Sequence, residues 1–194
     1  ARLRARQPGR PVRARLVTRS ADLRPGGARG AARRVRAALE RAGVEVRTGT
    51  AFDPHGVAPG EWVLWATGAQ AHAWPAASAL ACDDAGFVRV DAQLRSVSHP
   101  HVHAVGDGAA WAPPLPKAGV YAVRMGPVLA QNLHAALGAG MPRPYRPQHR
   151  YLALLATADG RAVAAWGRWS AEGAWAWRWK DRIDRGFIAR FSPR

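Results

Sequence analysis

The stretch LRSVSHPHVHAVGDGA, residues 94–109, is the segment that decides how this 194-residue chain should fold. Residues 102–109 read as a strand that ends in Gly-Asp-Gly, and ligands bind where strands end at the carboxyl edge of a parallel sheet. Gly106 would let the backbone approach a bulky ligand, and the Asp107 carboxylate can accept hydrogen bonds from sugar hydroxyls. The alternative is a purely structural turn, because Gly-Asp-Gly is common in loops. Taken alone, the segment favours the turn.

The N-terminal third has the pattern of half a βαβ unit. Residues 12–18 read as a strand and residues 29–42 as an amphipathic helix, with its alanines, valine and leucine on one stripe. Gly43 is the type of residue that ends a helix, and a short strand follows at residues 44–47. This order predicts a parallel sheet.

Three further segments lead to a long helix. Residues 61–69 (EWVLWATGA) predict a buried strand that runs into a glycine turn, and residues 86–91 (GFVRVD) alternate as a strand does. The proline-rich residues 112–117 lead into a helix over 118–137, in which Pro127 should cause a kink or a break. Its expected apolar stripe consists of Leu129, Leu133 and Leu137.

The C-terminal part differs in character from the rest. After the proline-containing linker 141–148, residues 151–157 and 161–166 predict a β-hairpin, and residues 172–191 predict a helix. Every fourth residue of that helix is aromatic or aliphatic: Trp175, Trp179, Ile183, Phe187 and Phe191. The helix could lie on a membrane surface, with its arginines on anionic lipid. The pattern favours packing against the hairpin instead, because its tryptophans point to more than one face.

Composition narrows the class of protein. The formal net charge is +16, but the basic residues are scattered arginines and not a lysine-rich tail, so we expect no specific nucleic-acid partner. A single cysteine, Cys82, excludes an internal disulfide and a Cys-x-x-Cys redox pair. No secretory signal or long apolar segment is present, so we expect a cytoplasmic protein, either free or peripheral on the inner face of a membrane.

The order of these segments resembles a known family. The chain is similar to the C-terminal half of flavoproteins with two dinucleotide-binding domains. The similarity lies in the order of the segments WATG, GFVRVD and LRS-x-SHP-x-V-x-AVGD, which are followed by a proline-rich turn and a helix. These include the pyridine nucleotide-disulfide oxidoreductase-like proteins and the type II NADH dehydrogenases. The resemblance implies that Asp107 hydrogen-bonds the ribityl chain of FAD, next to Gly106. It also implies that the N-terminus of the following helix faces the pyrimidine edge of the flavin ring: Lys117, Ala118, Gly119 and Val120.

A positive helix end suits that position, because reduced flavin carries negative charge near N1 and O2. Lys117 could add a full charge there. The resemblance further places Thr67 and Gly68 at the turn where the chain passes between the two nucleotide domains, and a turn without ligand contact is the equal alternative. Arg19, at the end of a strand of the NAD(P)H domain, could favour the 2′-phosphate of NADPH. An ordinary solvent-exposed arginine is the stronger alternative there.

The C-terminal words are similar to a narrower group. Residues 117–133, 144–169 and 175–191 resemble the NADH dehydrogenase-like flavoproteins that are associated with, or fused to, selenide, water dikinase. The glycine-rich loops that seat the pyrophosphates of FAD and NAD(P)H in this family do not occur in the sequence. We therefore expect the chain to represent the later portion of such a protein, to need the missing N-terminal portion as its partner, and to bind both cofactors weakly by itself.

No side chain stands out as a catalytic acid, base or nucleophile. His99, His101 and His103 have the spacing of ligands on one face of a strand, but they lack further partners except Asp107. We expect His101 and His103 to pack or to border the flavin crevice, and we expect no metal site.

These observations predict an α/β protein with a partial FAD/NAD(P) two-domain fold and a small C-terminal hairpin plus helix. Residues 1–68 would be the later part of the NAD(P)H domain, 69–140 the C-terminal part of the FAD domain, and 141–194 the hairpin and helix. The expected function is electron transfer from NAD(P)H through FAD to a quinone or another acceptor. The alternative is a non-catalytic, flavoprotein-like module that serves as a basic or membrane-surface binding domain.

Overall fold

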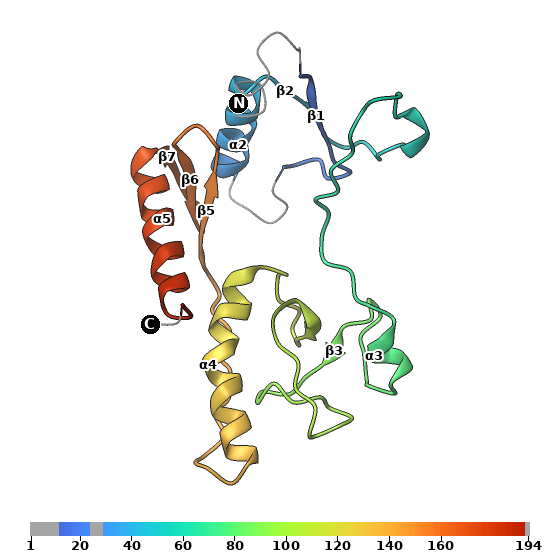
Figure 1. The fold of residues 1–194 in the computed structure, drawn as a ribbon, viewed down its shortest axis with the longest axis vertical. Helices are drawn as coiled ribbons and strands as arrows, with labels where there is room; N and C mark the ends of the chain where they lie inside the picture. Colours follow the sequence, from blue (N-terminus) through green and yellow to red (C-terminus); the bar gives the residue numbers. More distant parts are fainter. Residues whose placement is uncertain (1–11, 24–28, 193–194) are drawn as a thin grey trace. The chain divides into compact units, whose positions relative to one another are not determined.

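The computed structural model describes residues 12–23 and 29–192, and it divides the chain into two compact units (Figure 1). The first unit joins the described residues up to Glu61 with residues 150–192. The second unit is Trp62–His149. The C-terminal segment thus packs with the N-terminal segment in a single unit, although the two are far apart in the sequence. The three functional domains inferred from sequence remain predictions.

The N-terminal part of the first unit forms the expected half of a βαβ arrangement. Strand β1 (Ala14–Val17) and strand β2 (Val44–Arg47) pair in parallel, with Ala14 opposite Val44, and helix α2 (Arg29–Arg41) lies between them in the chain. Gly43 has a φ of 67°, a left-handed conformation that glycine adopts without strain, and it ends the helix. The strand, helix, strand prediction is confirmed.

The C-terminal part of the first unit is a three-stranded antiparallel sheet. Strands β5 (Leu152–Ala156), β6 (Ala162–Trp166) and β7 (Trp169–Gly173) follow one another in space as they do in the chain. The predicted hairpin is β5 and β6, but the third strand was not expected. Residues 172 and 173, assigned to the helix from sequence, belong to β7, and helix α5 spans Ala174–Ala189.

Strand β6 is the centre of the first unit because both of its faces are covered. Val163 and Ala165 point toward α2, where they form a buried cluster with Ala31. Ala162 and Ala164 point the other way and form a second cluster with Ala176 of α5. Figure 1 shows α2 and α5 on either side of the sheet. The small side chains of β6 allow both helices to approach closely, and the alternation follows from the twofold period of a strand.

One carboxylate joins the elements of this unit. The side chain of Glu172 in β7 is only 8 % exposed, and it forms ion pairs with Arg41 of α2 and with Arg161, which precedes β6. A buried carboxylate needs such partners, since an unpaired buried charge is costly. Glu172 therefore fixes α2 against the edge of the sheet.

The second unit contains little regular structure apart from one long helix. Its elements are the short helix α3 (Trp74–Ala77), strand β3 (Val88–Arg89), the 3₁₀ turn η2 (Gly106–Gly108), strand β4 (Ala109–Ala110) and helix α4 (Gly119–Ala136). Strands β3 and β4 pair in parallel, with Val88 opposite Ala109. A further 3₁₀ turn, η1 (Pro54–Gly56), lies in the first unit.

Two strand predictions are wrong. Residues 61–69 are not a strand, and no strand of the described chain pairs with them; Trp62 is 92 % and Leu64 is 87 % exposed. An apolar segment becomes a strand only when neighbouring strands satisfy its backbone, and the described residues supply none here. The Gly-Asp-Gly motif also does not end a strand. It forms η2, and the strand β4 follows it, because the left-handed φ of 59° at Gly106 breaks the extended backbone before the turn.

The helix α4 was predicted correctly within one residue at each end, but its buried face was not. Tyr121, Met125, Val128 and Asn132 are buried, whereas Leu133 is 43 % and Leu137 is 87 % exposed. The Asn132 amide explains the shift: its Nδ2 donates to the carbonyls of Gln93 and Arg143, and its Oδ1 accepts from the Arg143 backbone N–H. Pro127 does not split the helix, which is continuous across it.

Helix α5 packs on the sheet only through its first turns. Ala176 is its one buried residue among those described, and Trp175 contacts the rings of Trp169 and Trp179. Further along, Ile183 is 47 % and Phe187 is 40 % exposed. Trp175 and Trp179 are 42 % and 43 % exposed, so the packing on the sheet buries Ala176 and covers the large side chains of the stripe only in part. Among the described residues, no helix is long and apolar enough to cross a membrane.

Candidate functional site

The candidate site is built around the turn η2, which lies against the first turns of α4. At Gly106, an added Cβ would meet the Cβ of Ala122 at 2.9 Å, so the turn and the helix touch at a point where only hydrogen fits. The Gly106 backbone N–H donates to the Met125 sulfur at 3.1 Å. Glycine is therefore favoured at position 106 for two reasons: the backbone has a left-handed φ there, and α4 leaves no room for a side chain.

Asp107 is the acidic residue of this turn. Asp107 is exposed, and within the described part of the chain no group donates a hydrogen bond to its side chain. Its oxygens are thus available to accept hydrogen bonds from hydroxyl groups of a ligand. The turn η2 sets the backbone conformation at Asp107, and so it sets the place on the surface from which the carboxylate can reach a ligand.

The start of α4 offers backbone donors next to the turn. Ala118 is the N-cap residue, with an extended backbone, and no side chain caps the helix there. The first N–H groups of a helix have no intrahelical acceptor, and the helix dipole places partial positive charge on them. Gly119 and Val120 therefore provide donors that suit an anionic or electron-rich ligand edge.

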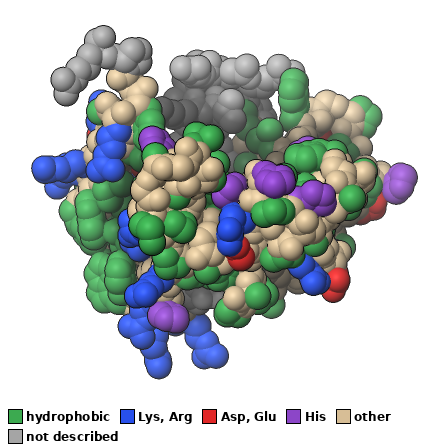
Figure 2. Space-filling view, turned by 90° about the horizontal axis from the view of Figure 1, so that it is seen from below, with side chains coloured by type: hydrophobic (Ala, Val, Ile, Leu, Met, Phe, Trp, Pro, Cys, Tyr) green, Lys and Arg blue, Asp and Glu red, His purple; other side chains and the backbone are tan. Residues whose placement is uncertain are grey.

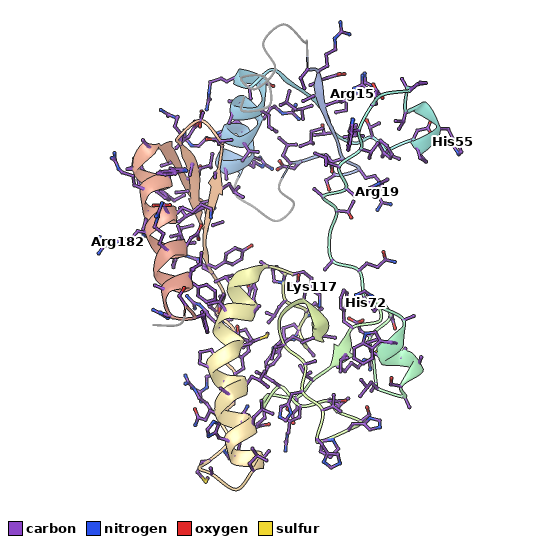
Figure 3. The ribbon with its side chains drawn as sticks, viewed as in Figure 1. Arg15, Arg19, His55, His72, Lys117 and Arg182 are labelled. Atoms are coloured by element: carbon purple, nitrogen blue, oxygen red, sulfur yellow. The ribbon has the colours of Figure 1, made fainter. Side chains whose placement is uncertain are left out.

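The side chain of Lys117 connects the two halves of the site. Its Nζ donates to the carbonyl of Asp107 at 2.9 Å and to the carbonyl of Ala109 at 2.8 Å. It also lies 3.6 Å from the centroid of the Phe87 ring. Burial lowers the pKa of the Lys117 ammonium below the ordinary lysine value, while the carboxylates of Asp83 and Asp107 act in the opposite direction. Figure 3 labels Lys117 beside the start of α4.

The structure brings together six of the nine residues singled out from the sequence: Gly106, Asp107, Lys117, Ala118, Gly119 and Val120 all lie at the contact of η2 and α4. Thr67 and Gly68 belong to the exposed segment of the second unit, and no hydrogen bond of the described residues joins them to η2 or α4. Arg19 follows β1 in the first unit and is exposed. The ligand roles proposed for all nine remain predictions.

The three histidines before the motif do not form a cluster. His99 is partly buried, and its Nδ1 lies 2.9 Å from the Ser98 hydroxyl. His101 is exposed. Both ring nitrogens of His103 are buried without a hydrogen-bond partner in the described structure. Figure 2 shows several histidine side chains at the surface of one face. No three His, Cys, Asp or Glu side chains among the described residues could hold a metal ion.

Sequence reasoning missed three residues of the site: Phe87, which lies under the Lys117 ammonium, and Ala122 and Met125, which contact Gly106. Ala122 and Met125 are three residues apart on α4 and so share a face, which was a signal that the sequence contained. Phe87 had no such signal, because its role depends on where β3 places it.

Comparison with models of protein families gives a match that covers the candidate site. The family model described as pyridine nucleotide-disulphide oxidoreductase matches residues 9–136, a span that ends with α4 and includes η2 and every residue of the candidate site. The sheet β5–β7 and helix α5 lie outside it. A search of curated proteins finds no match.

Proposed function

The chain belongs to the pyridine nucleotide-disulphide oxidoreductase family, and on that premise we propose that it functions as an FAD-dependent oxidoreductase that passes electrons from NAD(P)H to a quinone or another acceptor. Proteins of this family generally bind FAD and use NAD(P)H. The mixed helices and strands of the chain fit the α/β nucleotide-binding fold of the family. The observation that carries the proposal is the exposed Asp107 carboxylate on a fixed turn beside an uncapped helix N-terminus.

Bound flavin would supply the redox chemistry, accepting a hydride from NAD(P)H and passing electrons on. The work proposed for the chain's own residues is binding and electrostatics. Asp107 would accept hydrogen bonds from the ribityl hydroxyls, and the N–H groups of Gly119 and Val120 would donate toward the pyrimidine edge of the ring. Such donors stabilise the negative charge that develops there on reduction.

The nicotinamide site is proposed for the first unit. Arg19 follows β1, where its guanidinium could bind the 2′-phosphate of NADPH. If Arg19 is instead an ordinary surface arginine, the preference between NADH and NADPH should be the same in Arg19→Ala as in the native protein. The narrower relation to flavoproteins of selenide, water dikinase rests on the sequence words of the C-terminal part, and the family match does not extend to that part.

A second proposal concerns α5. We propose that this helix contacts the surface of an anionic membrane, which would place the protein beside a quinone pool. Its support is the open apolar stripe after Ala176 together with the basic residues Arg178, Lys180, Arg182, Arg185 and Arg190. Only Lys180 and Arg185 are engaged in ion pairs among those described. Figure 3 shows Arg182 directed outward from α5. Aromatic side chains and free arginines are the combination that binds anionic lipid surfaces.

The flavin proposal is tested by replacing the carboxylate. Asp107→Ala should weaken FAD binding by about tenfold or more, since hydrogen bonds to a charged acceptor contribute about 1.5–3 kcal/mol. The measurement is the quenching of FAD fluorescence on titration with native and variant protein. Asp84→Ala, which changes another exposed carboxylate of the same unit, serves as the control and should leave the affinity unchanged.

Equal FAD affinity in the native protein and in Asp107→Ala would contradict the assignment of the motif. Binding of FAD without any oxidation of NADH or NADPH would instead favour the non-catalytic alternative, a flavoprotein-like module that acts as a basic or membrane-surface domain.

A further inference from the structure

The geometry points to Lys117 as a positioning residue that holds the flavin-binding turn in place, and we propose that it acts on the flavin through the backbone of η2 and not by direct contact. This inference rests on the proposed function, because it assigns a role within that site. It differs from the expectation drawn from sequence, in which the Lys117 charge faces the flavin ring.

The ammonium group is directed toward protein atoms. Two of its three N–H bonds are accounted for by the carbonyls of Asp107 and Ala109, at 2.9 and 2.8 Å. Those carbonyls belong to the residues on either side of Gly108, so the ammonium bridges the end of the η2 turn. An ammonium has only three donors, and one is left for solvent or a ligand.

A third contact anchors the ammonium itself. The face of the Phe87 ring lies 3.6 Å away, within the range of a cation–π interaction. Phe87 is 9 % exposed and directly precedes β3, whose Val88 pairs with Ala109. Lys117 therefore joins three segments that are far apart in the sequence: the start of β3, the turn η2 and the entry to α4.

The contacts of Lys117 Nζ favour a positively charged group at the end of a narrow side chain. Two carbonyls and an aromatic face all present negative potential, and the carboxylates of Asp83 and Asp107 add to it. A neutral side chain of the same length would leave the two carbonyls to water, and the turn would then be held on α4 only by the contacts of Gly106 with Ala122 and Met125. Asp107 would then keep its carboxylate but lose its fixed position, and orientation is what a binding turn contributes.

The test compares Lys117→Met with Lys117→Arg, and with Lys180→Met as the matched control. Lys180 is the only other lysine of the chain; it lies on α5 and pairs with Asp184. Two quantities are measured on each full-length variant: amide hydrogen exchange of residues 104–112 without flavin, and FAD affinity by fluorescence titration. Circular dichroism establishes that each variant is folded.

We expect the amides of residues 106–109 to exchange faster in Lys117→Met. FAD should bind about three- to tenfold more weakly. The loss is limited to this range because charged hydrogen bonds near the surface are partly screened by solvent. Lys117→Arg keeps the charge and should recover part of both losses. Lys180→Met should match the native protein in both measurements.

Three results would overturn the proposal. Unchanged exchange at residues 106–109 in Lys117→Met would show that the ammonium does not hold the turn. Faster exchange with unchanged FAD affinity would show that the turn is held but that this does not serve the flavin. Weaker FAD binding with unchanged exchange would restore the direct contact between Lys117 and the ring. If the native protein binds no FAD while exchange responds to Lys117→Met, the proposed function fails and the bridge is a feature of the fold alone.

Discussion

Gly106 is the residue on which the geometry of the site depends most strictly. Gly106→Ala places a Cβ 2.9 Å from the Cβ of Ala122 at a residue whose φ is 59°. The strain and the clash together should lower the free energy of unfolding by about 1–3 kcal/mol. Chemical denaturation, followed by tryptophan fluorescence and circular dichroism, measures it.

Gly108→Ala is the matched control for this prediction, because no atom lies within 4 Å of its added Cβ. It should change stability by much less. Combining Gly106→Ala with Ala122→Gly removes the clash but keeps the backbone strain, so the double variant should recover only part of the loss. Full stability in Gly106→Ala alone would mean that η2 does not lie on α4 as described.

At the residue scale, the sequence predicted that the Gly-Asp pair and the start of α4 lie together but not how they are held; their roles in binding remain predictions. The Gly-Asp pair and the start of α4 were identified from the motif, and the structure brings them together. The bridge from Lys117 to the carbonyls of Asp107 and Ala109 has no sequence pattern, because backbone carbonyls belong to every residue. Only the fold determines which of them an ammonium meets.

At the scale of elements, Glu172 tests whether the C-terminal sheet is fixed to α2. Its buried carboxylate pairs with Arg41 and Arg161, so Glu172→Gln removes the charge from both ion pairs and leaves two arginines unpaired. We expect the free energy of unfolding to fall by about 1–3 kcal/mol, less than for a fully buried pair because the arginines are half exposed. Thermal denaturation provides the measurement.

Glu45→Gln is the corresponding surface change. Glu45 pairs with Arg15 and Arg47 but is 50 % exposed, and exposed ion pairs contribute little to stability. A loss in Glu45→Gln as large as that in Glu172→Gln would contradict the distinction.

The membrane proposal is also tested on an element. Replacing Ile183 and Phe187 by serine should weaken cosedimentation with vesicles of phosphatidylcholine and phosphatidylglycerol, because two of the exposed apolar anchors of α5 are lost. Leu137→Ser, an equally drastic change of an 87 % exposed leucine on another element, should leave it unchanged. Native protein that fails to bind these vesicles, or that binds neutral vesicles equally well, would exclude α5 as a site for anionic membranes.

Elements with their own periodicity were predictable, and those that depend on distant partners were not. The helices α4 and α5 and the pair β1 and β2 follow from apolar spacing and from end signals such as Gly43. Residues 61–69 have the composition of a buried strand but lie exposed, since a strand requires neighbours that its own sequence does not specify. The buried face of α4 was misassigned for a related reason, because the polar Asn132 is buried for its hydrogen bonds to Gln93 and Arg143.

At the scale of the whole molecule, the family match covers both units in part. Residues 9–136 include β1, α2 and β2 of the first unit and nearly all regular structure of the second. The unmatched sheet β5–β7 completes the first unit by covering α2. The core of this protein is thus assembled from family-typical and additional segments, whereas the candidate flavin site lies wholly within the part that the family model matches.

The most direct test of the flavin site is amide hydrogen exchange of the full chain with and without FAD. We expect slower exchange on addition of FAD at residues 106–107 and at the first turn of α4, with β5–β7 unchanged as an internal reference. Unchanged exchange at η2 and the start of α4 at rising FAD concentrations, or protection confined to other segments, would contradict the assignment of this turn and helix as the flavin site.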